Sequence, residues 1–195
     1  MNETEQELIA MVLSGRAEAF EPLVAPYRAP VVALAYRLTR DREEAREVAQ
    51  EAFLKAFRSL GRFDVSRSFR NWLFQIAANE ARDRLRKSRR ERFALEAAAL
   101  ERPDGAAAGT GVARRGPEAD RERAEVRSGI MGLLGLLGPR EREVFVLRDL
   151  EELDIRETAR ALGCSAISVR VNLSSARRKL REAIRRDFPH LEEGR

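Results

Sequence analysis

The side chains that usually carry out catalysis are scarce in this chain of 195 residues. His190 is the single histidine and Cys164 the single cysteine, so no Cys–His pair and no zinc-binding set of ligands can be assembled in a folded region. The carboxylates of Asp41, Glu44 and Glu47 lie close in sequence, but without histidine partners they fit the surface of a capped helix better than a metal site. We therefore expect no catalytic residue, no metal ligand and no cofactor, and predict that the protein is not an enzyme.

Basic residues gather in two short stretches of the chain and acidic residues in a third. Residues 80–92 hold seven basic and three acidic side chains, residues 166–186 hold seven and one, and residues 41–57 hold three and five. The formal net charge is only +5, so the distribution is more informative than the total. This pattern favours two contacts with a polyanion and one with a protein. Solvated helix faces are the alternative that composition alone leaves open.

Helices must position these residues, because Leu, Ala, Arg and Glu dominate and no alternating strand pattern occurs. Residues 17–38 have helical apolar spacing, but the prolines inside them predict two shorter pieces or a kinked helix. Asp41 is expected to cap a helix from Arg42 to about Leu60. A short loop then leads into a helix from Phe69 to about Arg90.

The chain is expected to divide into two modules. Of the 21 residues from 97 to 117, 13 are Ala, Gly or Pro, which is typical of a flexible linker rather than a core. The prediction is an all-α protein with a first helical domain at residues 1–92, a linker at 93–127 and a second domain at 128–190. No apolar run approaches the length of a membrane span. The single cysteine and the acidic start of the chain favour the cytoplasm.

The second module has the form of a helix-turn-helix within a four-helix unit. Asp154 and Glu157 predict a capping box for a helix from Ile155 to Leu162, and Gly163 marks the turn after it. Ser165 is expected to cap a long basic helix from Ala166 to about Arg186. The glycines at 129, 132 and 135 predict either a weak preceding helix or one that a neighbour approaches closely. An ordinary helical hairpin would share this pattern, but the basic end of the last helix favours DNA binding.

The last helix has two distinct faces. On a helical wheel five apolar residues turn inward, namely Val169, Leu173, Ala176, Leu180 and Ile184. The opposite face carries Ile167, Arg170, Val171, Ser174 and Arg178. Because branched apolar side chains pack against thymine methyl groups in the major groove, Ile167 and Val171 are predicted to contact bases. Arg170 would read a base edge or a phosphate, and Arg177, Arg178 and Arg181 would hold phosphates.

Aromatic residues flank a polar loop in the first module. Phe63, Phe69, Trp72 and Phe74 lie around residues 64–68, directly before the arginine-rich stretch. Aromatic and basic residues together suit stacking of single-stranded bases. They would equally suit the core of a three-helix unit, which is the interpretation favoured for Phe74, whereas spacing leaves Phe63 and Trp72 undecided.

Two segments of the chain resemble a known family. The run DREEAREVAQEAFLKAFRSLGRFDVSRSFRNWLFQIAANEARDRLR is similar to region two of the extracytoplasmic-function sigma factors of bacterial RNA polymerase. The run LGPREREVFVLRDLEELDIRETARALGCSAISVRVNLSSARRKLREAI is similar to their region four. The resemblance covers roughly Glu5 to Arg90 and Ser128 to Arg186, in the expected order and separation.

The resemblance implies a sigma factor that binds core polymerase, directs it to specific promoters and assists DNA melting. It implies that the clamp coiled coil of the polymerase's largest subunit is contacted by Asp41, Glu44, Glu47, Gln50, Glu51, Phe53 and Leu54. It assigns recognition and melting of the minus-ten element to Phe63, Ser66, Arg67, Ser68, Phe69, Trp72, Asn79, Arg82, Asp83 and Arg86. Reading of the minus-thirty-five element falls to Ser165, Ile167, Ser168, Arg170, Val171, Ser174, Ser175, Arg177 and Arg178.

Partners other than polymerase and promoter DNA stay open. The resemblance leaves room for an anti-sigma protein, for which the unusual Pro22 and Pro26 would offer an altered surface. Two rival functions also remain: a dimeric helix-turn-helix regulator that never enters polymerase, and a sigma-like decoy that binds an anti-sigma protein.

Replacing Val171 with serine tests the assignment of the last helix. Because Val171 is predicted to contact thymine methyl groups, Val171→Ser should change the preferred DNA sequence more than the overall affinity. The measurement is binding to a set of duplexes at constant salt. Equal weakening on every duplex would reject the assignment.

Overall fold

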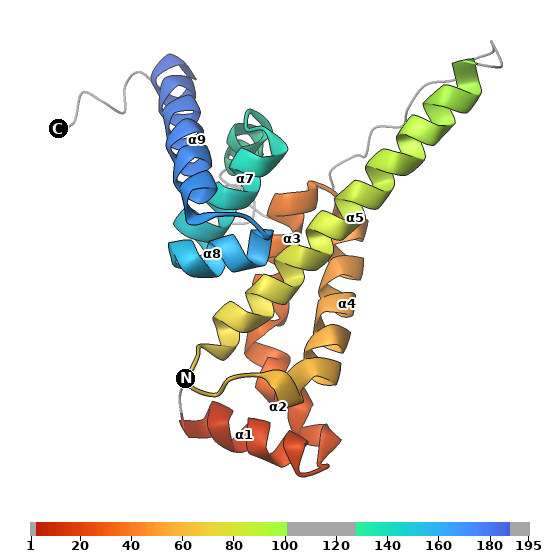
Figure 1. The fold of residues 1–195 in the computed structure, drawn as a ribbon, viewed down its shortest axis with the longest axis vertical. Helices are drawn as coiled ribbons and strands as arrows, with labels where there is room; N and C mark the ends of the chain where they lie inside the picture. Colours follow the sequence, from red (N-terminus) through yellow and green to blue (C-terminus); the bar gives the residue numbers. More distant parts are fainter. Residues whose placement is uncertain (1–2, 101–127, 188–195) are drawn as a thin grey trace, which may run out of the picture.

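The computed structural model describes residues 3–100 and 128–187, and every regular element in these residues is helical. The first module contains α1 (Glu3–Leu13), α2 (Phe20–Val24), α3 (Arg28–Thr39), α4 (Arg42–Ser59) and α5 (Phe69–Leu100). The second contains helical residues 128–135, α7 (Pro139–Phe145), a π-helical turn η4 (Val146–Leu150), α8 (Ile155–Leu162) and α9 (Ala166–Asp187). The all-α prediction with a helix-turn-helix in the second part is confirmed, as Figure 1 shows.

The prolines divide the first helical region as expected. Pro22 lies in the short helix α2, Pro26 lies in a 3₁₀ turn, and Pro30 is the third residue of α3. Proline is tolerated in the first turn of a helix because its missing N–H would have no partner there. The chain therefore changes direction in short steps before α3 begins.

Small residues let α3, α4 and α5 pack closely in the core of the first module. Ala45, Ala49, Ala52 and Ala56 form a buried stripe along α4, facing larger buried residues of the neighbouring helices. Among those are Val31, Leu34, Leu73 and Phe74. Asp41 caps α4 by accepting hydrogen bonds from the backbone N–H groups of Glu43 and Glu44, at 2.8 and 3.0 Å.

One predicted boundary is wrong. The long helix of the first module was expected to end near Arg90, but α5 continues to Leu100. Its last residues are mostly alanine and leucine, which suit a helix interior better than a flexible segment. Residues 101–127, the rest of the predicted linker, lie outside the described residues. In the second module, helical residues run without a break from Pro139 to Leu150 and change from α-helix to a π-helical turn at Val146.

The helix-turn-helix is held by the caps that the sequence predicts. Asp154 accepts a hydrogen bond from the backbone N–H of Glu157 at 2.7 Å, and the Glu157 carboxylate accepts one from the N–H of Asp154 at 2.8 Å. Gly163 then has a φ of 57°, a left-handed conformation that glycine adopts without strain. The hydroxyl of Ser165 accepts a hydrogen bond from the N–H of Ser168 at 3.1 Å and starts α9.

Glu141 fastens α9 to the start of α7. Its carboxylate accepts hydrogen bonds from Lys179 at 2.8 Å, from the Ser175 hydroxyl at 2.7 Å and from the N–H of Gly138 at 2.8 Å. The hydrogen bonds from Lys179 and Ser175 lower the pKa of Glu141 to about 2. The ionised form of this side chain therefore stabilises the second module.

The two modules are in contact. Helix α8 packs against α5 (Figure 1), and the buried apolar residues of both modules form one continuous cluster. Arg37 and Arg70 of the first module hydrogen-bond to Glu151 of the second. Gly135 lies against Arg40, since a Cβ atom on this glycine would stand 3.0 Å from the Arg40 guanidinium. The glycines predicted either a weak helix or one that a neighbour approaches closely. At position 135 the second explanation holds.

Acid should remove the contribution of Glu141 to stability. Its folded pKa is depressed below the unfolded value, so the stabilisation is complete above about pH 4.5 and is lost as the pH falls towards about 2. Glu141→Gln should lower the free energy of unfolding by about 1–2 kcal/mol near neutral pH. Chemical unfolding at several pH values would measure this, with the exposed Glu152→Gln as the control. A difference between Glu141→Gln and the wild type that stays constant down to about pH 3 would contradict the assignment.

Candidate nucleic-acid interface

The outer face of α9 presents apolar side chains to solvent. The side chains of Ile167 and Val171 are 70% and 63% exposed, and Arg170 and Ser174 between and beside them are exposed as well. Val169 on the opposite side of the helix is fully buried. The predicted division of the helix into two faces is confirmed. Packing within the chain gives Ile167 and Val171 no role, which leaves the contact with DNA as their predicted one.

Other predicted residues of α9 already have partners within the module. Arg177 donates two hydrogen bonds to Asp149 of η4, at 2.7 and 2.8 Å, and Arg178 donates one to Glu182 at 3.2 Å. Ser175 is half-buried and bonded to Glu141. Ser168 is half-buried too, and its carbonyl accepts a hydrogen bond from Asn172 at 2.8 Å. The freely presented part of the predicted surface is therefore the first two turns of the helix.

In the first module an aromatic cluster lies beneath the loop of residues 64–68. The ring centroids of Phe63 and Trp72 are 4.9 Å apart, and both rings stand 5.7 Å from that of Phe69. Phe69 has no exposed surface, so it supports the cluster from the core and meets no base in this conformation. Phe63 is nearly buried and Trp72 is half-buried. Phe74 is fully buried, which confirms its assignment to the core.

The loop itself is a compact exposed turn. The Asp64 carboxylate accepts hydrogen bonds from the N–H and the hydroxyl of Ser66, at 3.0 and 2.7 Å, and these bonds lower its pKa. The Arg67 guanidinium lies 3.7 Å from the same carboxylate. Ser68 accepts a hydrogen bond from the N–H of Asn71 at 3.2 Å and so caps the start of α5. Ser66 and Arg67 are exposed and available to a ligand.

Further along α5, four of the predicted minus-ten residues, Asn79, Arg82, Asp83 and Arg86, fall into two pairs. Arg82 donates a hydrogen bond to Asn79 at 2.7 Å, and both are half-buried. The Arg82 side chain reaches the turn of the helix-turn-helix, where it lies 3.9 Å from the position of a Cβ atom on Gly163. Its Nε atom is buried and has no hydrogen-bond partner among the described residues. Asp83 and Arg86 are exposed, with their charged groups 3.9 Å apart.

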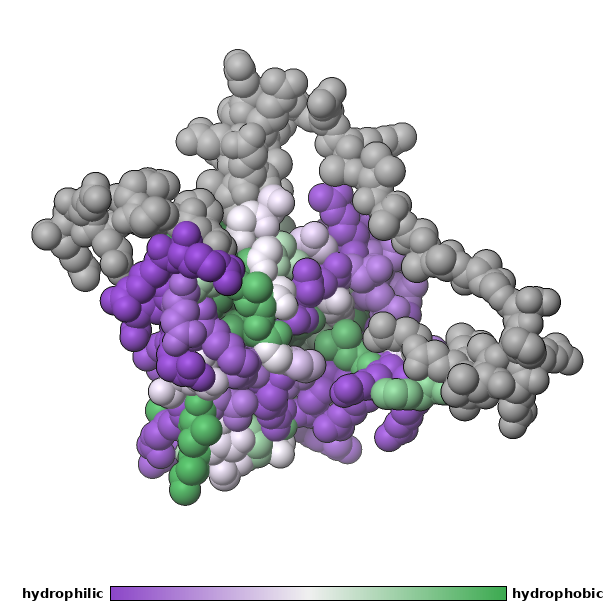
Figure 2. Space-filling model, turned by 90° about the horizontal axis from the view of Figure 1, so that it is seen from above, coloured by the Kyte–Doolittle hydropathy of each residue, from purple (hydrophilic) through white to green (hydrophobic). Residues whose placement is uncertain are grey.

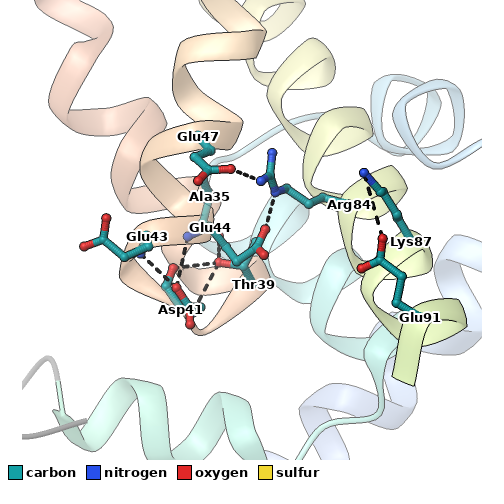
Figure 3. A network of polar contacts seen from close by, with 9 residues as sticks. All are labelled: Ala35, Thr39, Asp41, Glu43, Glu44, Glu47, Arg84, Lys87 and Glu91. Carbon is teal, nitrogen blue, oxygen red and sulfur yellow. Dashed lines mark hydrogen bonds and ion pairs between the residues drawn. The ribbon is translucent and has the colours of Figure 1, made fainter. Parts of the chain in front are cut away.

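Helix α4 is predicted to bind polymerase, and two of its acidic side chains form ion pairs with α5. Arg84 of α5 forms ion pairs with both Glu44 and Glu47, as Figure 3 shows. Gln50 and Leu54 are exposed further along α4. The rest of the set is Asp41, which caps the helix, and the half-buried Glu51 and Phe53. The structure thus leaves Gln50 and Leu54 as the exposed members of this set that neither cap a helix nor form an ion pair.

Sequence reasoning missed two features. One is the contact between the modules, which involves Arg37, Arg70 and Glu151. The other is an apolar pocket of about 440 Å³ in the second module, lined by Ile130, Leu133, Phe145 and Ile184 among others. The helical spacing of these residues indicates an apolar helix face. The same spacing is typical of core residues, so it could not reveal that this face lines a pocket. Figure 2 shows hydrophobic residues gathered near the middle of one largely hydrophilic face of the molecule.

Among residues 3–100 and 128–187, no group of three or more histidine, cysteine, aspartate and glutamate side chains could hold a metal ion. Within the same ranges, no helix is both long enough and apolar enough to cross a bilayer.

Comparison with known proteins identifies the family. Residues 23–91 match the model of sigma-70 region 2, and residues 128–180 match that of sigma-70 region 4. The RNA polymerase sigma-H factor of Pseudomonas aeruginosa is 32% identical over 184 residues, covering 93% of this chain and 94% of the relative. The ECF RNA polymerase sigma factor SigW of Bacillus subtilis is 30% identical, covering 91% and 95%.

A solved structure agrees with these relatives. CnrH, in complex with the cytosolic domain of CnrY, superposes with a TM-score of 0.64 at 27% identity, covering 95% of this chain and 99% of that one. CnrH of Cupriavidus metallidurans is itself named an RNA polymerase sigma factor. With both regions present in order and relatives matched over nearly their full length, the chain belongs to the sigma-70 family, among the extracytoplasmic-function RNA polymerase sigma factors.

Proposed function

We propose that this sigma factor contacts both promoter elements and the polymerase through three separate surfaces. The observation that carries the proposal is the exposed apolar face of α9, the second helix of a capped helix-turn-helix, in a chain that also contains region 2. Ile167, Arg170 and Val171 would enter the major groove of the minus-thirty-five element. Arg178 would hold a phosphate, and Arg177 would have to leave Asp149 to do the same.

The minus-ten element would be bound by the first module. Ser66 and Arg67 are exposed on the loop, and the half-buried Trp72 lies beside it. These side chains would hold an unstacked base, whose flipping costs a few kcal/mol that the pocket must offset. Phe63 and Phe69 would support the loop from below, while Asn79, Arg82, Asp83 and Arg86 would contact the adjoining duplex.

Helix α4 would dock on the clamp coiled coil of the largest subunit of core polymerase. Gln50 and Leu54 are accessible there, and Glu47 lies one turn earlier. Leu54 is 42% exposed, an apolar side chain that docking would cover. Glu44 and Glu47 would exchange their partner Arg84 for basic groups of the polymerase.

The protein would act by binding and not by catalysis, in the cytoplasm where polymerase works. An anti-sigma protein is a further proposed partner. Support for it comes from the solved structure of CnrH, whose fold this chain shares over 95% of its length and which is in complex with the cytosolic domain of CnrY.

Run-off transcription with purified core polymerase and a promoter library tests the function. Transcripts that depend on this protein are the expected result. Silence combined with intact duplex binding would support a regulator that does not enter polymerase. Silence combined with tight binding to an anti-sigma protein would support a decoy.

A variant of α4 tests the proposed polymerase surface. Leu54→Glu should reduce transcription about ten-fold or more, because a charge would enter the centre of an apolar contact. It should leave duplex binding unchanged. Val32→Glu, the same type of change at another exposed apolar position, is the matched control. Equal activity of the two variants would place the polymerase contact elsewhere.

A further inference from the structure

The far end of α5 extends past the core of the first module. Among the described side chains of this helix, Ala81 is the last that is buried. Arg84 then forms the ion pairs that join α5 to α4. Beyond it, Figure 1 shows α5 continuing away from the other helices. Packing within the described part of the chain does not account for residues 86–94, which we call the distal end of α5.

A single face of α5 runs from the module into the distal end. Its members recur at intervals of three and four residues, and they are Asn79, Arg82, Arg86, Arg89 and Phe93. Residues with this spacing are neighbours on the surface of a helix. The first three are proposed to contact the duplex that adjoins the minus-ten element. Arg89 and Phe93 continue the same face for about two turns, or about 10 Å.

Two cations of the distal end have no carboxylate partner. Arg86 lies 3.9 Å from Asp83, and Lys87 lies 3.9 Å from Glu91. Arg89 and Arg90 are exposed, and neither forms an ion pair with any side chain that the structure describes. Neighbouring cations without compensating acids, held on one rigid helix, attract a polyanion.

An aromatic ring holds one of these cations in position. The guanidinium carbon of Arg89 lies 5.8 Å from the centre of the Phe93 ring, one helical turn further along α5. Phe93 is 60% exposed, so it is not part of the core. A ring against the face of a guanidinium restricts its orientation and leaves the N–H groups at its edge for a ligand. Phe93 is therefore a positioning residue for Arg89.

The order of the proposed contacts along α5 decides which part of the DNA the distal end meets. Near the start of the helix, Trp72 lies beside the loop that is proposed to hold an unstacked base. Asn79 to Arg86 follow and are proposed to contact the adjoining duplex. The distal end comes next in the same direction, so it would lie over duplex on the side away from the melted strand. Its additional 10 Å spans about three base pairs.

We propose that Arg89 and Arg90 bind the phosphate backbone of this duplex, next to the minus-ten element and away from the melted strand, with Phe93 positioning Arg89. The proposal rests on the proposed minus-ten role of the first module for its place on the promoter, whereas phosphate binding is a property of the chain itself. Continuity with the DNA-facing residues of α5 favours duplex DNA over an acidic protein surface. Because phosphates carry no sequence information, the contact would strengthen binding to every promoter alike.

The salt dependence of binding to a random-sequence duplex tests these contacts in the full-length chain. Each phosphate contact that is lost should reduce the slope of log affinity against log salt by about 0.9. The double variant Arg89→Gln with Arg90→Gln should therefore have a slope smaller by roughly two and an affinity lower by about ten-fold or more. Glutamine has nearly the helix propensity of arginine, so circular dichroism should show an intact helix.

The matched control removes two exposed arginines elsewhere in the first module. Arg28→Gln with Arg46→Gln makes the same change in net charge, and each of these residues already pairs with a glutamate. This control should keep the wild-type slope. Arg89→Lys with Arg90→Lys should keep it too, because lysine can hold a phosphate as a point charge.

A double-mutant cycle tests the role of Phe93. Phe93→Leu should weaken duplex binding by about two- to five-fold in the wild type. It should have no effect when residue 89 is glutamine, because the ring acts only through Arg89. Phe93→Tyr, which keeps an aromatic face, should bind like the wild type. Equal weakening by Phe93→Leu in both backgrounds would reveal a purely structural role and overturn this part of the proposal.

Two forked promoter fragments, bound in the presence of core polymerase, test the place of the contact. One carries about ten base pairs of duplex, one helical turn, beyond the minus-ten element, and in the other the duplex ends at that element. The double glutamine variant should lose affinity on the first fragment and keep it on the second. Equal loss on both would place the two arginines at the minus-ten element itself and overturn the assigned position.

The two assays separate this proposal from the proposed function. A wild-type salt slope for the double glutamine variant would overturn phosphate binding. If that variant also assembled poorly with polymerase, the two arginines would belong to a protein contact instead. If neither promoter fragment were bound, the proposed function would fail, and the random-sequence duplex would still decide whether the arginines bind phosphates.

Discussion

An ionised carboxylate can leave water only where positive groups are already in place to meet it, and in this protein those groups lie on the other module. Glu151 reaches its buried position because Arg37 on α3 and Arg70 on α5 converge on it. In the same arrangement α8 lies along α5, the turn at Gly163 lies near Arg82, and Gly135 lies against Arg40. The relative placement of the two modules thus combines the compensation of this charge with the apolar packing that joins their buried residues into one cluster.

The two modules differ in how many of the side chains proposed to bind DNA or polymerase already have partners within the chain. The outer face of α9 is complete as it stands, because Glu141 holds the helix from behind and leaves Ile167 and Val171 in solvent. In the first module, Arg82 lies beside the turn of the second module and donates a hydrogen bond to Asn79. On α4, Glu44 and Glu47 form ion pairs with Arg84. A sigma factor with these features would exchange internal partners for external ones on α4, and such exchanges favour specificity over raw affinity.

Local features of this architecture could be predicted from the sequence, and long-range ones could not. Asp41, Asp154 and Ser165 cap their helices as expected, because a cap depends only on residues within one turn. The inward and outward faces of α9 follow from helical spacing in the same way. Arg37 and Glu151 are 114 residues apart, and nothing in either local sequence indicates their pairing. The complete burial of Phe69 was equally hidden, since aromatic residues beside a polar loop suit both a core and a stacking site. The end of α5 was misplaced because alanine is common in linkers and is also the strongest helix former.

The distance between the modules with and without core polymerase tests this account most directly. Spin labels at Gln6→Cys and Glu182→Cys, in a Cys164→Ser background, would report it by pulsed electron resonance on the full-length chain. Both positions are exposed, and one lies on each module. The account predicts one short distance in the free protein and a longer one once polymerase is added. A free protein with a broad range of distances, or a short distance that polymerase leaves unchanged, would contradict it.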